Sequence, residues 1–362
     1  MWRWLVVLAA AGCGRHINPA WCAQPGHSDP ACPVDAGIDT AAGSCTRDAD
    51  CPGTACLLPE GVCAAPAAML YVSPTGAGAA CTSTAKCALG TAIEQSTTER
   101  NLILMDRASY TGAIAIDHAV RILGNGATLE GPSVGAAVVV TSGVAVELER
   151  VTITGTAAGS AISCTSGSLT ARGVVITGNQ LGITSACALT VTGSVLSDNS
   201  DGALVIVSGA IAIRNNFIVN NGNPMLGRSA NVTIAAGVTG AFSFNTVAYN
   251  DTKANSTPGV DCAATGLVAT GNLITDNTHK GGFDVDPQVT GVCDFSQSYT
   301  LPGAGGNDLH WVNVAASDFH LTAASTAVID SPGLTCAGLD DFDGDVRPLG
   351  AGCEFGADEY RP

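Results

Sequence analysis

The sequence predicts an all-β solenoid, and three observations point to it. Five six-residue segments share one template, in which the third position is always aliphatic and the sixth is always Asn. The segments recur every 20 to 29 residues, so each repeat is too small to bury its own apolar face and must stack on its neighbours. The composition, with 44 Gly and 5% aromatic residues, suits thin stacked coils. The segments are VVITGN, SVLSDN, NFIVNN, NTVAYN and NLITDN, which end at Asn179, Asn199, Asn221, Asn250 and Asn277.

The residues before each template alternate between apolar and polar, as in the pairs Leu169 with Ala171 and Leu189 with Val191. Alternation at period two, rich in Val, Ile and Thr, predicts at least two short strands in each repeat. We expect the fixed Asn to adopt the left-handed conformation of a sharp bend and to bond its amide to the Asn one coil away, as a ladder. The alternative is a set of hairpins in a β-sandwich, which would scatter Asn relative to the strands.

Residues 68–306 resemble the right-handed parallel β-helix proteins of the pectin-lyase-like family. The resemblance rests on the repeats and on the opening YVSPTGAGAACTSTAKCALGTAIEQ (71–95), followed by NLILMDRASYTGAIAI (101–116). It implies a single-stranded right-handed parallel β-helix that begins with a capping helix. Leu89, Ala92 and Ile93 would form the apolar stripe of that helix.

The C-terminal residues 307–362 carry DFHLTAASTAVIDSPGL and DFDGDVRPLGAGCEFGADEY. These strings resemble the choice-of-anchor Q domain that ends many bacterial β-helix proteins, which implies a cap over the second open end of the rod. The apolar surface of that cap would come from Trp311, Phe319, Leu321, Val328, Ile329, Phe342 and Phe355. No cofactor is required by this interpretation. Calcium at Asp341, Asp343 and Asp345 is one hypothesis, and a solvated acidic turn in which Arg347 pairs with Asp345 is the other.

The N-terminus reads as an export signal in residues 1–12 followed by Cys13. Ala10, Ala11 and Gly12 before Cys13 resemble a bacterial lipobox, which implies lipidation of Cys13 and anchoring to the outer membrane or surface of a Gram-negative cell; a signal peptide cut nearby is the alternative. Residues 13–67 form a Cys-rich, Pro-, Gly- and Ala-rich segment that we interpret as a disulfide-stapled spacer. A zinc site is the competing interpretation of its cysteines.

The cysteine count supports export, because 15 Cys less a lipidated Cys13 leaves an even number that can close into disulfides. Cys164 and Cys187 are separated by about one coil, and stacking would bring them within bridging distance. Three further local pairs are expected: Cys81 with Cys87, Cys262 with Cys293 and Cys336 with Cys353.

An enzymatic function must be tested against the residues, since the β-helix family includes lyases and hydrolases of acidic polysaccharides. The catalytic candidates are Asp198, Asp276 and His279. Three coil steps of about 4.8 Å would separate the two Asp residues by about 14 Å, more than the 5 to 9.5 Å of a carboxylate pair. A formal net charge of −16 also disfavours a polyanionic substrate and excludes nucleic acid as an expected partner.

Two long inter-repeat segments, 222–235 and 251–264, should protrude from the same side of adjacent coils. Their candidate ligand-binding residues are Asn223, Arg228, Asp251 and Lys253. The sequence therefore predicts a surface lipoprotein whose β-helix has a binding, adhesive or structural role, with polysaccharide or a surface protein as partner. A polysaccharide lyase or glycoside hydrolase is the alternative.

Overall fold

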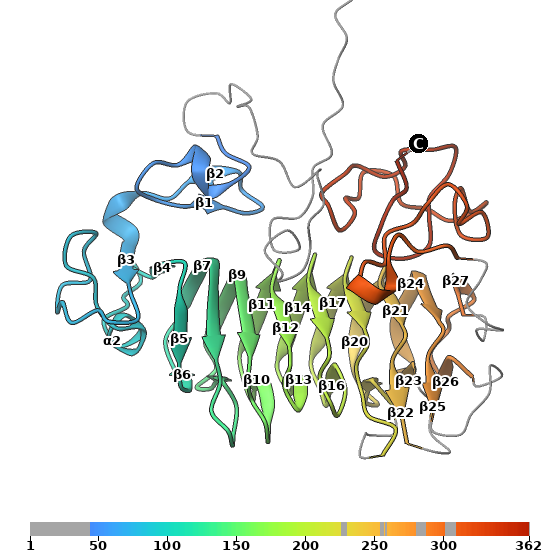
Figure 1. Ribbon diagram of the computed structural model, residues 1–362, viewed down its shortest axis with the longest axis horizontal. Helices are drawn as coiled ribbons and strands as arrows, with labels where there is room; N and C mark the ends of the chain where they lie inside the picture. Colours follow the sequence, from blue (N-terminus) through green and yellow to red (C-terminus); the bar gives the residue numbers. More distant parts are fainter. Residues whose placement is uncertain are drawn as a thin grey trace, which may run out of the picture.

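The computed structural model describes residues 44–225, 230–253, 257, 259–279, 287–300 and 309–361. Within these ranges the chain winds into a parallel β-helix, with successive coils stacked side by side along a rod (Figure 1). A typical coil contributes three strands, one more than the minimum that the sequence predicts. The predicted all-β parallel β-helix is therefore confirmed.

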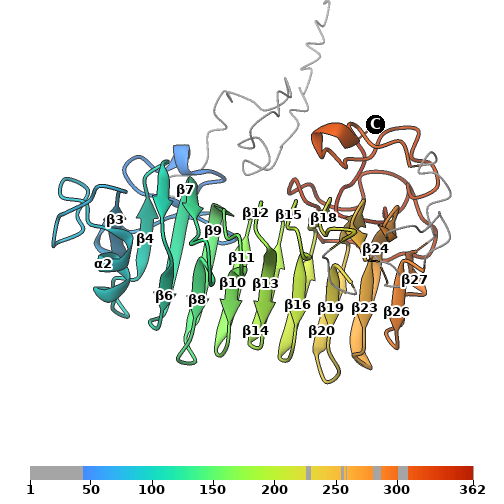
Figure 2. The same cartoon turned by 60° about the horizontal axis from the view of Figure 1, so that its bottom comes forward.

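The first face of the rod is an eight-stranded parallel sheet in the described residues. It is most easily followed in the view of Figure 2. Along the rod its strands are β6 (Ile114–Ile116), β8 (Val138–Val140), β10 (Ser160–Cys164), β13 (Leu181–Ser185), β16 (Leu204–Ile206), β19 (Val232–Ile234), β23 (Val260–Cys262) and β26 (Val289–Gly291).

The other two faces belong to one branched sheet, because the long strands β7 (Val120–Glu130), β9 (Ala145–Thr154) and β24 (Gly266–Thr275) run across both. The second face adds β3 (Met69–Val72), β4 (Leu102–Met105), β11 (Ser168–Arg172), β14 (Ala188–Thr192), β17 (Ala210–Arg214), β20 (Thr239–Ser243) and β27 (Gln297–Tyr299). The third face adds β5 (Ser109–Thr111), β12 (Val175–Thr177), β15 (Val195–Ser197), β18 (Phe217–Val219) and β21 (Thr246–Ala248).

The Asn ladder forms as predicted, but the left-handed residue is its neighbour. Each template Asn is preceded by a residue with positive φ, for example Asp198 at 54° and Tyr249 at 55°. The Asn itself is buried, and its amide is satisfied on both sides. Asn221 Nδ2 donates to Asn250 Oδ1 at 3.0 Å, while Asn221 Oδ1 accepts from Asn199 Nδ2 at 2.9 Å. The Asn is therefore selected for its amide rather than for its backbone conformation.

A second ladder, which the sequence analysis missed, lines the bend between the second and third faces. Asn216 donates to Asn245 at 2.9 Å, and Asn245 donates to Asn272 at 3.1 Å. Ser194 and Ser298 continue it at its two ends. Two neutral amide ladders thus run along the rod without burying a charge.

The interior of the rod is one continuous apolar cluster, filled mostly by Val, Ile, Leu and Ala. At the N-terminal end, helix α2 (Leu89–Glu94) buries Leu89, Ala92 and Ile93 in that cluster, as predicted. The four predicted disulfides are also present: Cys81–Cys87, Cys164–Cys187, Cys262–Cys293 and Cys336–Cys353. None of the helices among the described residues is long and apolar enough to cross a membrane.

A small N-terminal module, residues 44–68, is docked on the outer surface of the rod (Figure 1). Arg121 of β7 pairs with Glu60 at 3.0 Å, and Arg150 pairs with Asp48 at 2.8 Å. The described part of the predicted spacer is therefore a packed part of the fold, and its four cysteines form disulfides rather than a zinc site. Its pairs are Cys45–Cys56 and Cys51–Cys63, and its elements are η1 (Asp48–Asp50), β1 (Cys56–Leu57), β2 (Val62–Cys63) and η2 (Pro66–Ala68).

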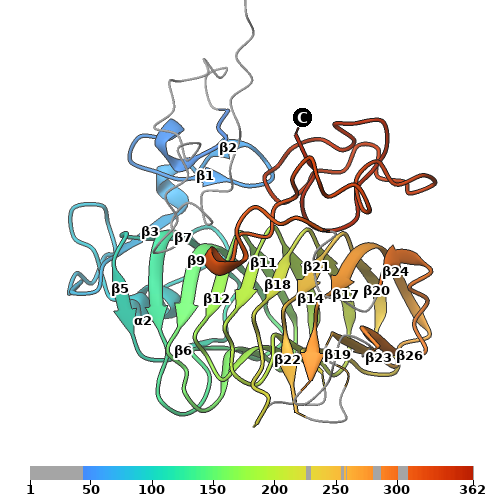
Figure 3. The ribbon, with the colours of Figure 1, turned by 45° about the vertical axis from the view of Figure 1, so that its right-hand side comes forward.

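The C-terminal segment, residues 309–361, forms a lobe on the flank of the rod and does not fill its open end, which corrects the predicted position of the cap (Figure 3). Among the described residues of this lobe, none belongs to the interior cluster. The apolar residues expected to form the cap do form its contact surface; Phe342, for instance, lies 4.6 Å from the ring of Phe217. Apart from η3 (Val314–Ala316), the lobe is built of loops and turns.

The strands of the rod beneath the lobe are shielded on both of their faces. In β15, β18 and β21 all three residues of each strand are buried, so inward- and outward-facing side chains are both shielded. Phe217 points outward against the lobe, whereas Phe242 lies in the interior cluster of the rod.

Candidate functional site

The turn column is the row of left-handed residues before the first Asn ladder, made by Gly178, Asp198, Asn220, Tyr249 and Asp276. The strand register places its members on successive coils, since Ser197 pairs with Val219, Val219 with Ala248, and Ala248 with Thr275. Asp198 and Asp276 are therefore separated by two intervening residues of the column. The structure does not bring these two catalytic candidates together.

The C-terminal lobe covers the column between the two Asp residues. Asn220 Nδ2 donates to Ser317 Oγ at 2.8 Å, and the ring of Tyr249 lies 5.4 Å from that of Phe319. Burial raises the pKa of Tyr249, and the nearby Asp276 carboxylate adds to the shift. A sugar chain could not lie across Asp198 and Asp276 while the lobe is in this position.

The third catalytic candidate, His279, lies in a short two-stranded sheet that follows the first Asn ladder. It belongs to β25 (Thr278–His279), which pairs with β22 (Asp251–Thr252) so that Thr252 opposes His279. Asp251 accepts a hydrogen bond from the hydroxyl of Thr278 at 3.2 Å. The short sheet therefore places the catalytic candidate His279 and the binding candidate Asp251 on adjacent strands, but the side chain of Asp251 shares a face with Thr278 and that of His279 shares the other face with the buried Thr252.

The structure does not bring the other binding candidates together at this two-stranded sheet in the described residues. Asn223 folds back on its own loop, where its side-chain oxygen accepts from the backbone N–H of Met225 at 2.8 Å. Lys253 is exposed directly after β22. Arg228 lies outside the described residues, as do Cys13 and the signal segment.

The three carboxylates proposed for calcium do not converge. Asp341 accepts the backbone N–H groups of Asp345 and Glu359, at 2.7 and 3.1 Å. Asp345 forms an ion pair with Arg361, whereas Asp343 faces His320 at 3.3 Å. The alternative pairing of Arg347 with Asp345 is not observed either, because Arg347 binds Glu359.

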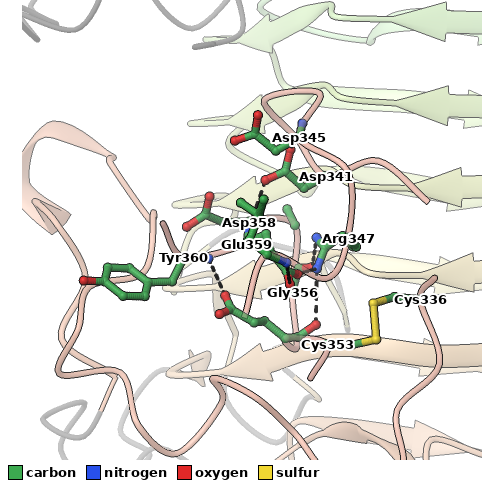
Figure 4. Close-up of polar contacts among 12 residues, drawn as sticks. Cys336, Asp341, Asp345, Arg347, Cys353, Gly356, Asp358, Glu359 and Tyr360 are labelled. Carbon is green, nitrogen blue, oxygen red and sulfur yellow. Dashed lines mark hydrogen bonds and ion pairs between the residues drawn. A yellow bond between two sulfur atoms is a disulfide. The ribbon is translucent and has the colours of Figure 1, made fainter. Parts of the chain in front are cut away.

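The lobe instead contains a network of buried charged groups, most of which the sequence analysis did not single out (Figure 4). Arg347 is only 1% exposed and binds Glu359 at 2.8 Å, as well as the carbonyl oxygens of Glu354 and Gly356. Its guanidinium also lies 4.9 Å from the ring centre of Phe244 on the rod. Arg347 thus connects the end of the chain to the β-helix.

Burial perturbs the ionisation of this network. It raises the pKa of Asp341 and of Glu354 to about 8, and nearby carboxylates add to both shifts. Burial alone would lower the pKa of His320, but the carboxylates of Asp358, Asp318 and Asp343 outweigh it and raise the pKa well above its usual value. Perturbed groups of this kind occur both in functional sites and in structural ion networks.

Together these features define the protein as a disulfide-stapled parallel β-helix, with the N-terminal module and the C-terminal lobe docked on its outer surface. No family model and no curated protein matches the sequence. Among solved structures, the pectate lyase Pel9A is similar, with 14% identity and a TM-score of 0.42 over 81% of this chain and 96% of that chain. At this level the likeness concerns the fold alone and implies no activity. The resemblance of the C-terminal residues to the choice-of-anchor Q domain stays a prediction.

Proposed function

We propose that this protein is an exported surface protein whose β-helix is a rigid, non-catalytic scaffold for binding or for cell-surface structure. One observation supports the non-catalytic part above the others: the lobe covers Asn220 and Tyr249, which separate the only two acidic residues of the turn column. Glycoside hydrolysis by two carboxylates requires both to reach one bond. The disulfides of the described residues are consistent with export to an oxidising compartment.

The ligand surface that we favour is the one around β22 and β25. Asp251 and Lys253 supply polar groups there, and the stacked coils of the rod lie beneath them. Recognition by loops on a rigid repeat scaffold is common. Carbohydrate is the partner that we would test first.

A polysaccharide lyase or hydrolase is the alternative, and one observation favours it. His279 and Asp251 lie on paired strands, so a base and a carboxylate are close in the chain's fold, with their side chains on opposite faces of the two-stranded sheet. Incubating the full chain with a panel of uronic-acid and neutral polysaccharides, with calcium and with a chelator, distinguishes the two functions. Binding without loss of viscosity or new ultraviolet absorbance supports the scaffold. Cleavage that disappears in His279→Gln would establish the enzyme.

Lipid anchoring through Cys13 is a separate part of the proposal, and it rests on the sequence. Metabolic labelling with a fatty-acid probe should mark the wild-type protein but not Cys13→Ala. Equal labelling of the two proteins would rule out lipid anchoring through Cys13, and with it the basis for the predicted outer-membrane location.

A further inference from the structure

Three side chains from separate segments of the C-terminal lobe converge on one point. His320, Asp343 and Asp358 each offer a ligand atom, and these atoms lie within 4.8 Å of one another. His320 Nε2 is 3.3 Å from Asp343 Oδ2. Two ligands of a tetrahedral zinc ion, each about 2.0–2.1 Å from the metal, are separated by about that distance.

The second nitrogen of His320 is held as it is in many metal sites. His320 Nδ1 lies 2.6 Å from Oδ1 of Asp318, which is buried. A metal-binding His commonly donates its other ring N–H to a carboxylate, which fixes the tautomer and the ring orientation. With Nδ1–H donated to Asp318, Nε2 is directed towards Asp343.

The charge of the cluster is not balanced by its own groups. Asp318, Asp343 and Asp358 supply three carboxylates, and His320 supplies at most one positive charge. Asp358 is only 5% exposed, and its one hydrogen bond to the described residues comes from the Leu321 N–H to Oδ2 at 2.7 Å, so Oδ1 accepts none. The two nearby guanidinium groups already have carboxylate partners, because Arg347 binds Glu359 and Arg361 binds Asp345. A divalent cation would offset this excess of negative charge.

We propose that His320, Asp343 and Asp358 bind one zinc-class divalent cation that holds the C-terminal lobe on the flank of the β-helix, with Asp318 orienting His320. One imidazole with two carboxylates favours a borderline metal such as zinc, whereas calcium takes six to eight oxygen ligands. The His320 ring lies 5.2 Å from that of Phe217 on β18, so the ion would fix the part of the lobe that contacts the rod.

The test uses the full-length, tag-free, disulfide-intact protein after treatment with a chelator. Titration with ZnCl₂ by calorimetry should show one site per chain, and CaCl₂ over the same range should give no binding heat. X-ray absorption of the zinc-loaded protein should show only nitrogen and oxygen neighbours, at about 2.0–2.2 Å, with one imidazole. A sulfur shell, or the absence of zinc binding to the folded protein, would overturn the proposal.

Variants separate the ligands from their surroundings. Asp343→Asn should lose zinc affinity by more than Asp318→Asn, for which a 10- to 100-fold loss is expected from its orienting role. Asp294→Asn, which changes an exposed carboxylate of the rod in the same way, should bind like the wild type. Equal zinc affinity in Asp343→Asn and the wild type would contradict the assignment. If Asp343→Asn does not fold, the absorption spectrum of the wild type still decides the question.

Discussion

The coils of the rod that carry the Asn ladders and the C-terminal lobe bury polar groups in opposite ways. The rod repeats a neutral device, the Asn ladder, in which each amide satisfies the next, as between Asn221 and Asn250. The lobe has little regular structure and buries charged groups instead, with Arg347 and Glu359 fully enclosed. A repeat can extend a neutral ladder indefinitely, whereas a non-repeating segment needs one specific network. The difference implies that single substitutions will affect the two regions separately.

The largest effect is expected at Arg347. Arg347→Met removes the partner of Glu359 and leaves a buried charge without compensation, which costs about 3–5 kcal/mol of unfolding free energy. Limited proteolysis should then cut within residues 309–361 while the rod stays intact. Arg214→Met provides the matched control, because its pair with Asp340 is on the surface and such pairs contribute about 0–1 kcal/mol. An equal loss of unfolding free energy in the two variants would contradict a special role of the buried Arg347–Glu359 pair.

A somewhat smaller loss is expected in the middle of the first ladder. Asn221→Ala deprives the backbone N–H and the side-chain amide of Asn199 of their acceptor, and each unsatisfied buried group costs about 1–3 kcal/mol. Denaturant unfolding followed by circular dichroism should show a loss of about 3 kcal/mol. Asn223→Ala, in the neighbouring loop, should lose less than about 1 kcal/mol. A ladder without energetic importance would give the two variants the same stability.

The two regions should also differ in their response to pH. The pKa of Glu354 is raised by burial to about 8 in the folded lobe, so the folded state holds a proton that the unfolded chain releases above its ordinary value. The stabilisation is complete below that ordinary value and is lost as the pH rises through about 8. Protease resistance of the lobe should therefore fall between pH 6 and pH 9 while that of the rod does not. Glu354→Gln should weaken this dependence; an unchanged profile would contradict the assignment.

The smallest effect is expected at Asp198, which is exposed at the turn column. Asp198→Asn should change the unfolding free energy by less than about 0.5 kcal/mol. It should also leave polysaccharide binding unaltered, because the covered column offers no second carboxylate to act with Asp198. A change in product formation would instead assign Asp198 to a catalytic site.

The rod could be predicted from the sequence because the same apolar and Asn positions recur in every repeat. The third and sixth template positions fall in the interior and in the ladder, as Ile218 and Asn221 show. The second ladder had a visible signal, since three templates also begin with Asn, at positions 216, 245 and 272. The left-handed position was the harder inference, because Tyr249 occupies it although its side chain does not favour that conformation.

The position of the lobe could not be predicted in the same way. Its contacts join residues more than a hundred apart, such as Asn215 with Asp340, and no repeat fixes them. One indication was available: FIV in β18 and VLS in β15 do not alternate apolar with polar residues, which indicates that both faces are covered. The convergence of His320 with Asp343 and Asp358 likewise depends on loop geometry that spacing does not encode.

The most direct test concerns the docking of the lobe on the flank of the rod. Arg214 Nη2 lies 2.8 Å from Asp340 Oδ1 across that contact, so Arg214→Lys places an amine beside the carboxylate. Carbodiimide coupling followed by mass spectrometry should then recover one peptide pair that joins the segments around residues 214 and 340. Lys86 and Asp106, which are 2.5 Å apart within the rod, provide a positive control in the same sample. Coupling at both sites is the predicted result. Coupling at Lys86 without any at position 214 would contradict the docking of the C-terminal lobe on the flank of the rod.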